Sequence, residues 1–180
     1  MVKEPRAGRV KTRLGQQVGM TAAAWWFRHQ TRRLLRRLAD PRWTLILAVT
    51  PDDEGLRSRV WPSRFPRLPQ GRGDLGRRMS RCLLAVPGPV VLIGADIPGI
   101  EGRHVAQAFR ELGRHESVIG PATDGGFWLI GLRHPEKVSC DILDGIAWSR
   151  SDTLAHTLPR LPGPIARVAT LSDVDDAGDL

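Results

Sequence analysis

The segment Val91-Leu92-Ile93-Gly94-Ala95-Asp96-Ile97-Pro98 decides the fold, because a run of apolar residues ends abruptly in one carboxylate. The pattern predicts a buried strand that delivers Asp96 to its carboxyl end, after which Pro98 ends the strand. In open α/β sheets the ligand crevice lies outside the carboxyl ends of the strands, so Asp96 is positioned to hold a metal ion or a polar substrate. An Asp that caps the following helix is the alternative, and this segment alone favours neither.

Strands and helices alternate along the rest of the chain. Helices are predicted over residues 22–39, 75–86, 101–112 and 151–158, and strands over 43–50, 90–95, 117–120, 126–132 and 165–171. Residues 51–71 are rich in proline and predict a looser connection. The alternation predicts an α/β fold in one domain over residues 1–180, with a mostly parallel sheet covered by helices on both faces.

Composition excludes several classes of protein. The chain has 180 residues, of which 41% are hydrophobic and 26% charged, as in ordinary globular domains. No apolar stretch approaches the length of a membrane span, and no signal peptide is evident, so we expect a cytoplasmic protein. Its two cysteines match no zinc-binding spacing and are expected to be reduced.

The N-terminal segment carries a second chemical signal. Lysines and arginines crowd around Gly8, which is the composition of a phosphate-facing loop; they are Lys3, Arg6, Arg9, Lys11 and Arg13. Lysine supplies a point charge and arginine a planar fork, so together they could hold a di- or triphosphate. The segment is not a Walker motif. A basic tail without a ligand is the alternative, and the segment alone favours it.

Three other loops are candidates for a site. The glycines of Gln70-Gly71-Arg72-Gly73-Asp74-Leu75-Gly76 allow a ligand to approach the backbone, at the start of a helix that favours an anion. Asp124-Gly125-Gly126 stands between two strand-like runs, where an ordinary hairpin turn is the alternative. Asp173 and Asp175 follow the last strand with the alternation that a pair of metal ligands needs, or belong to a solvated acidic C-terminus.

These segments form an ordered series of motifs that covers essentially the whole chain. The series is Lys3-x-Pro5-x-x-Gly8-x-Val10-Lys11-Thr12-Arg13-Leu14, Gln70-Gly71-x-Gly73-Asp74-Leu75-Gly76-x-x-Met79, Gly94-x-Asp96-x-Pro98, Gly120-Pro121-x-x-Asp124-Gly125-Gly126-x-x-Leu129-Ile130-Gly131, Ile146-x-Trp148-Ser149 and Asp173-Val174-Asp175. It resembles the GT-A-like (nucleotide-diphospho-sugar transferase) family of glycosyltransferase-type proteins related to 2-phospho-lactate guanylyltransferase, which includes members linked to arsenosugar biosynthesis. The resemblance implies a three-layer α/β/α GT-A-like fold.

The resemblance also implies roles for individual residues. Asp96 and Lys11 would be catalytic, with Asp96, Asp175 and Asp173 as candidate ligands of Mg²⁺ or Mn²⁺. The nucleotide would be bound by Gly8, Lys11, Arg13, Gln70, Gly71, Gly73, Asp74 and Gly76, and the acceptor by Asp124, Gly125, Gly126 and Trp148. A divalent cation that bridges the phosphates would stabilise the charge developing on the leaving group.

Two departures from the family pattern stand out. The chain begins at Met1-Val2, which leaves almost nothing to build the strand that precedes the basic loop, so the first strand is expected to be largely missing. Because an absent central strand leaves buried backbone groups unpaired, we expect the true start to lie upstream. Asp176 stands where such relatives often have Thr, with no evident consequence.

The sequence therefore predicts a metal-dependent transferase with a nucleotide-activated donor and a small-molecule acceptor. A glycosyltransferase that uses a nucleotide-diphospho-sugar is favoured; a guanylyltransferase-like nucleotidyltransferase that joins an NTP to a phosphorylated small molecule is the alternative. Neither nucleic acid nor membrane is expected as a partner. A minor alternative makes the arginines of residues 28–37 a footprint for nucleic acid or an anionic membrane.

Overall fold

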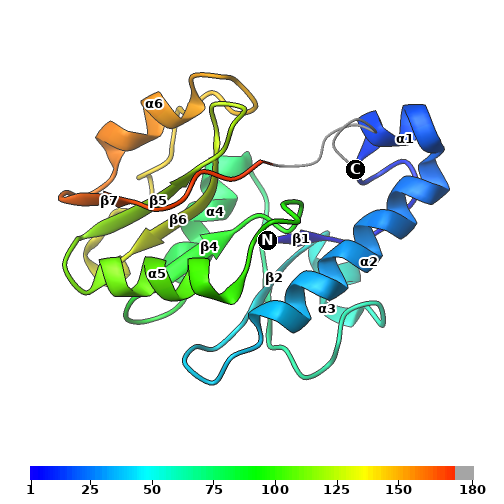
Figure 1. Cartoon of the computed structure of the whole chain (residues 1–180), viewed down its shortest axis with the longest axis horizontal. Coiled ribbons are helices and arrows are strands. Elements are labelled where there is room, and N and C mark those ends of the chain that lie inside the picture. Colours follow the sequence, from blue (N-terminus) through cyan, green and yellow to red (C-terminus); the bar gives the residue numbers. More distant parts are fainter. Residues whose placement is uncertain (173–180) are drawn as a thin grey trace. The chain divides into compact units, whose positions relative to one another are not determined.

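The computed structural model describes residues 1–172 and has a mixed α/β architecture (Figure 1). These residues group into two compact units. Unit 1 contains Met1–Pro69 and Ala95–Gly102, and unit 2 contains Gln70–Gly94 and Arg103–Ser172. Our expectation of a single domain over residues 1–180 stays a prediction.

Unit 1 is built on a three-stranded parallel sheet with the strand order β1-β2-β3. The strands are β1 (Val2–Lys3), β2 (Leu47–Thr50) and β3 (Arg67–Pro69), and the helices are α1 (Thr12–Val18), α2 (Met20–Leu38) and α3 (Asp52–Arg57). Figure 1 shows α2 in front of this sheet and α3 behind it. The first strand, which we expected to be largely missing, is present as two residues, in which Val2 pairs with Val49 and Lys3 with Thr50.

The long helix α2 forms because one of its faces is apolar. Seven side chains of this face are buried: Ala23, Ala24, Phe27, Thr31, Leu34, Leu35 and Leu38. They recur at the three- and four-residue spacing of an amphipathic helix. The exposed arginines of α2, which include Arg33, Arg36 and Arg37, lie outside this buried face and contact solvent.

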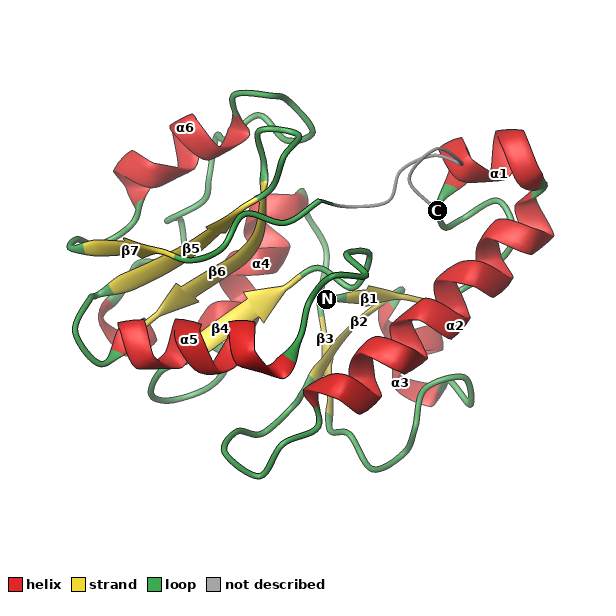
Figure 2. Ribbon diagram, in the orientation of Figure 1, coloured by secondary structure: helices red, strands yellow, loops and turns green. Residues whose placement is uncertain are grey.

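Unit 2 is built on a four-stranded mixed sheet with the strand order β4-β6-β5-β7. The strands are β4 (Val90–Ile93), β5 (Ser117–Pro121), β6 (Phe127–Leu132) and β7 (Ile165–Arg167). The central strand pairs are antiparallel, and β7 joins β5 in parallel. The helices are α4 (Leu75–Leu84), α5 (Gly102–Leu112) and α6 (Thr153–Thr157), with short 3₁₀ turns η1 (Pro135–Lys137) and η2 (Leu158–Arg160). Figure 2 shows α5 in front of the sheet and α4 behind it.

The core of unit 2 lies between that sheet and its helices. Side chains with almost no exposure come from the sheet (Val118, Ile119, Leu129, Ile130, Leu132) and from the surrounding elements (Leu83, Leu112, Leu143). Along β5 and β6 these buried residues are consecutive, as expected where both faces of a sheet are covered. The turns at the ends of these strands are thereby fixed to a packed core.

Most predicted elements are present, with shifts of a few residues at their ends. The helices α1 and α3, the strand β3 and the 3₁₀ turn η1 were not predicted; α3 and β3 lie inside the passage that was expected to be a looser connection. The strand before Asp96 also differs from its prediction. It ends at Ile93, and its residues are half-buried instead of buried because β4 is the edge strand of its sheet.

No helix within residues 1–172 combines the length and apolar character that a bilayer crossing requires.

Candidate functional site

The basic N-terminal segment is an ordered loop between β1 and α1. The amide of Glu4 extends the strand pairing by donating to Thr50 O at 2.8 Å, and the amide of Arg9 donates to Arg6 O at 3.0 Å. Val10 is buried and anchors the end of the loop. Lys11 then adopts a left-handed backbone conformation, with φ 45° and ψ 52°, and α1 begins. The alternative of an unstructured basic tail is therefore excluded.

Two arginines of this loop face a carboxylate of their own unit. Arg6 Nε lies 2.8 Å from Glu54 Oε2, and Arg9 Nη1 lies 3.3 Å from Glu54 Oε1. Glu54 belongs to α3, so these pairs tie the loop to the far helix of unit 1. The single carboxylate of Glu54 offsets at most one of these two positive charges. Gly8, with φ 74°, allows the turn between Arg6 and Arg9.

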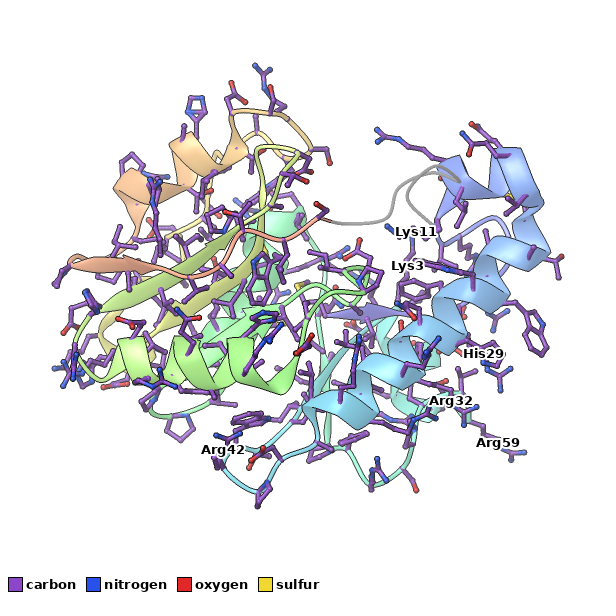
Figure 3. The ribbon with its side chains drawn as sticks, viewed as in Figure 1. Lys3, Lys11, His29, Arg32, Arg42 and Arg59 are labelled. Atoms are coloured by element: carbon purple, nitrogen blue, oxygen red, sulfur yellow. The ribbon has the colours of Figure 1, made fainter. Side chains whose placement is uncertain are left out.

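Lys11 and Asp96, the two predicted catalytic residues, come together within unit 1. Lys11 Nζ lies 3.3 Å from Asp96 Oδ2. The lysine side chain is only 8% exposed, whereas the carboxylate is 43% exposed. Figure 3 shows Lys11 near the start of α1. A buried ammonium group thus lies beside a carboxylate that solvent and ligands can reach.

The surroundings of Asp96 hold it in place. Its neighbours Ala95 and Ile97 are buried, and Arg37 of α2 donates to Pro98 O at 2.6 Å. The helix that follows, α5, begins at Gly102, six positions after Asp96. Since a capping side chain must lie within the first turn, Asp96 does not cap this helix.

Of the three predicted metal ligands, Asp96 lies among the described residues. Asp96 presents an exposed carboxylate, which is the hard oxygen ligand that Mg²⁺ and Mn²⁺ prefer, and Mg²⁺ commonly takes one or two carboxylates plus substrate phosphates. Within residues 1–172, no three side chains of His, Cys, Asp or Glu gather in a metal-binding group. Asp173 and Asp175 lie outside the described residues. The donor chemistry at Asp96 fits, and the metal itself stays a prediction.

In unit 2, the predicted nucleotide loop of residues 70–76 is held by an arginine that we did not predict. Arg81 of α4 donates through Nη1 to Gln70 O at 2.5 Å and through Nη2 to Arg72 O at 3.2 Å. Gly71 packs against the same guanidinium group: a Cβ atom there would lie 2.1 Å from Nη1 of Arg81. With φ 75°, Gly71 also has a backbone conformation that favours glycine. The loop is therefore built around Arg81.

The other members of this loop have structural tasks as well. The Asp74 side chain caps α4 by accepting a hydrogen bond from the amide of Arg77 at 2.9 Å. Gly73 has φ 113°. Gly76 is buried, and a Cβ atom there would lie 2.4 Å from Leu143 O and 2.8 Å from Cζ2 of Trp148.

Trp148, which we predicted to bind the acceptor substrate, thus lies beside the Gln70–Gly76 loop of the same unit. Its ring also meets Phe127 edge to face, with the centroids 6.2 Å apart. The buried Nε1 of Trp148 has no hydrogen-bond partner among residues 1–172. A donor without a partner is costly, which makes this indole a candidate contact for a polar ligand.

The Asp124-Gly125-Gly126 segment is the turn between β5 and β6, as in the hairpin alternative. Asp124 Oδ1 accepts a hydrogen bond from the amide of Gly126 at 2.8 Å. Gly125, with φ 87°, lies against Ser151, and its carbonyl accepts the amide of Leu154 at 2.9 Å. The turn is anchored to the start of α6. Its role in binding an acceptor stays a prediction.

Comparisons with known proteins agree with this architecture. The model of a family described as "Uncharacterized protein conserved in bacteria (DUF2064)" matches residues 34–150. A crystal structure from Desulfovibrio desulfuricans G20, provisionally named a nucleotide-diphospho-sugar transferase, is 32% identical with a TM-score of 0.84, over 97% of this chain and 80% of that one. No curated protein matches the chain.

More distant structures share the fold alone. The 4-diphosphocytidyl-2C-methyl-D-erythritol synthase of Anaerococcus prevotii DSM 20548 is 10% identical with a TM-score of 0.59, over 85% of this chain and 84% of that one. The protein Rv0371c of Mycobacterium tuberculosis H37Rv is 16% identical with a TM-score of 0.51, over 85% and 80% of the two chains. The predicted nucleotide-diphospho-sugar transferase fold is confirmed. None of these similarities bears on arsenosugars.

Proposed function

The chain belongs to the DUF2064 family, and we propose that it is a metal-dependent glycosyltransferase whose donor is a nucleotide-diphospho-sugar. The relative with 32% identity carries the name of a nucleotide-diphospho-sugar transferase, which supports this class of donor. The observation that carries the proposal is the Lys11–Asp96 pair. It combines a cation suited to a diphosphate with a carboxylate suited to the cation that accompanies one.

The two residues have different tasks in this proposal. Lys11 donates to a phosphate oxygen and stabilises the charge that grows on the leaving diphosphate, an effect that is strong because its side chain is shielded from water. Asp96 holds Mg²⁺ or Mn²⁺ through its exposed carboxylate, with Asp173 and Asp175 as further proposed ligands. The cation, when bound, supplies Lewis-acid stabilisation of the same diphosphate.

Other residues have binding tasks. We assign the backbone of the Gln70–Gly76 loop to the base and ribose, since Arg81 keeps the Gln70 and Arg72 carbonyls in fixed positions. Arg13 assists Lys11 at the phosphates. The Asp124–Gly126 turn and Trp148 bind the acceptor, for which the unpartnered Nε1 of Trp148 is a suitable donor.

The same residues would also suit nucleotidyl transfer, and one experiment separates the two reactions. Thermal unfolding is measured with Mn²⁺ and a panel of UDP-, GDP-, CDP- and dTDP-sugars and the corresponding triphosphates. The proposal expects that nucleotide sugars raise the unfolding temperature of the protein. It also expects that the protein slowly releases the nucleoside diphosphate from these sugars. Stabilisation by triphosphates alone, with pyrophosphate as the released product, would contradict glycosyl transfer and support the nucleotidyltransferase.

A further inference from the structure

One side of α2 carries a continuous stripe of cationic and aromatic side chains. We call Trp25, His29, Arg32, Arg33 and Arg36 the α2 stripe. At 100° per residue, Trp25, His29, Arg32 and Arg36 lie within an arc of about 60°, with Arg33 beside it. The stripe is about 16 Å long at 1.5 Å per residue and faces away from the buried side of the helix.

The arginines of this stripe have no partners of their own. Arg32, Arg33 and Arg36 make no side-chain hydrogen bond or ion pair within residues 1–172, whereas Arg6, Arg9 and Arg42 of the same unit each face a carboxylate. Their charges are therefore available to an external anion.

Acidic residues are absent from a long part of the sequence around the stripe. Residues 5–39 contain no Asp or Glu, although the chain has 19 among its 180 residues. A compositional bias of the sequence towards arginine explains why its basic residues are arginines, but it does not explain why acidic residues are absent from this stretch. No acidic residue of this stretch therefore offsets the positive charge of the stripe along α2 itself.

An aromatic ring ends the stripe. Trp25 is 58% exposed, more than the other large apolar side chains on the described surface. Its ring lies against that of His29, with the centroids 4.7 Å apart and an angle of 33° between the planes. Tryptophan is enriched at the level of lipid headgroups, where its ring meets apolar chains and its N–H stays wet.

From this combination we infer that the α2 stripe docks the protein on an anionic phospholipid surface. Arginine forks match phosphate groups, and a polybasic helix with a tryptophan is a recurrent membrane-surface element. The outer side of a helix is convex and can lie on a planar bilayer, whereas proteins that bind single-stranded nucleic acid hold it in a groove. This proposal differs from our sequence-based expectation of no membrane partner, which stays a prediction.

Vesicle binding tests the inference directly. The full chain is sedimented with vesicles of phosphatidylcholine alone or mixed with phosphatidylserine. The variant Arg32→Gln/Arg33→Gln/Arg36→Gln removes three charges of the stripe. Its control, Arg110→Gln/Arg114→Gln/Arg167→Gln, removes the same net charge from exposed arginines of unit 2. Circular dichroism checks that both variants fold.

The inference expects binding that depends on phosphatidylserine and weakens with salt. At roughly 1 kcal/mol per arginine near the surface, the stripe variant should bind on the order of 100-fold more weakly, while the control binds like the parent protein. Trp25→Ala should weaken binding several-fold, by losing its interfacial ring. No binding of the parent protein, or equal losses in stripe and control variants, would overturn the inference. So would tighter binding of single-stranded RNA or DNA at the same salt concentration that the stripe substitutions abolish.

Discussion

The ammonium group of Lys11 lies 3.3 Å from the carboxylate of Asp96, which is 85 positions away in the sequence. This relationship has two consequences, one for stability and one for ligand binding. Because the carboxylate is 43% exposed, solvent screens the pair, and its contribution to stability is small. In our proposal the arrangement matters for binding, where Lys11 and Asp96 contact phosphate and metal.

The energy of interaction between Lys11 and Asp96 can be measured in a double-mutant cycle. Lys11→Met, Asp96→Asn and the double variant are unfolded with urea. We expect a coupling energy of about 0.5–1 kcal/mol, since one partner is buried and the other is screened. A coupling energy near zero would mean that the two side chains do not interact in solution.

Gly71 and Arg81 should be energetically coupled. Gly71→Ala introduces a left-handed alanine and forces the guanidinium away from the carbonyls of Gln70 and Arg72, so we expect a loss of about 2–4 kcal/mol of unfolding free energy.

Gly88 is a matched control for this substitution. It has the same φ of 75°, but nothing lies within 4 Å of its Cβ position, so Gly88→Ala should cost only about 1–2 kcal/mol. In an Arg81→Ala background the cost of Gly71→Ala should fall to the same value. Equal costs at Gly71 and Gly88 in the parent protein would show that Arg81 does not support the loop.

Gly125, in the turn between β5 and β6, can be compared with Gly145, a glycine of similar φ that lies beyond η1. A Cβ atom at Gly125 would lie 2.0 Å from the backbone oxygen of Ser151, whereas Gly145, with φ 76°, is open. Chemical unfolding should therefore show a loss of more than about 3 kcal/mol for Gly125→Ala, and of about 1–2 kcal/mol for Gly145→Ala.

The variant Gly126→Ala distinguishes an effect on folding from an effect on acceptor binding in the same turn. Its φ is not positive, and a Cβ atom there would meet only the flexible carboxylate of Asp124, at 3.1 Å. We expect Gly126→Ala to fold with nearly unchanged stability. If the turn binds the acceptor, this variant should raise the KM for the acceptor and leave donor binding intact. An unchanged KM would remove Gly126 from the site.

Acid should weaken the fold in part through Asp40. The Arg42 side chain and then its backbone amide donate to this carboxylate and lower its pKa from 3.8 to about 2. A depressed pKa stabilises the folded state above the unfolded value, so this contribution is present above pH 3.8 and is lost as the pH falls towards about 2. An NMR titration should give a midpoint near 2 for Asp40, and a return towards 3.8 in Arg42→Gln. A midpoint of 3.8 in the parent protein would contradict the hydrogen bonds.

The sequence predicted the regular elements of unit 2 well, because α4, α5, β5 and β6 each combine the right period with flanking turn residues. It missed α1, because this seven-residue helix follows a left-handed Lys11 and has no capping side chain that would mark its start in the sequence. It missed β3 because prolines surround a strand of only three residues. Short elements like these are defined by their partners rather than by their own pattern.

Parts of the candidate site were accessible to sequence reasoning and parts were not. The meeting of Lys11 and Asp96 followed from two motifs in a known order, although Asp96 lies three residues beyond its strand and not at its end. Arg81 gave no signal, because its task depends on backbone carbonyls that no sequence pattern marks. Asp74, which we predicted to bind the nucleotide, caps α4, and its binding role stays a prediction.

The central claim is that Lys11 and Asp96 bind a nucleotide diphosphate together with a divalent cation. Calorimetry with Mn²⁺ and the best nucleotide sugar of the panel tests it most directly, on the parent protein, Lys11→Met and Asp96→Asn. The exposed residues Lys137 and Asp53 supply control variants with the same changes of charge, Lys137→Met and Asp53→Asn.

We predict that Lys11→Met and Asp96→Asn each weaken binding by about 30-fold or more, the loss of roughly 2 kcal/mol of charged interaction, while both controls bind like the parent protein. The Asp96→Asn protein should also lose its dependence on Mn²⁺. Binding of the nucleotide sugar by folded Lys11→Met and Asp96→Asn proteins with unchanged affinity and unchanged Mn²⁺ dependence would contradict the claim.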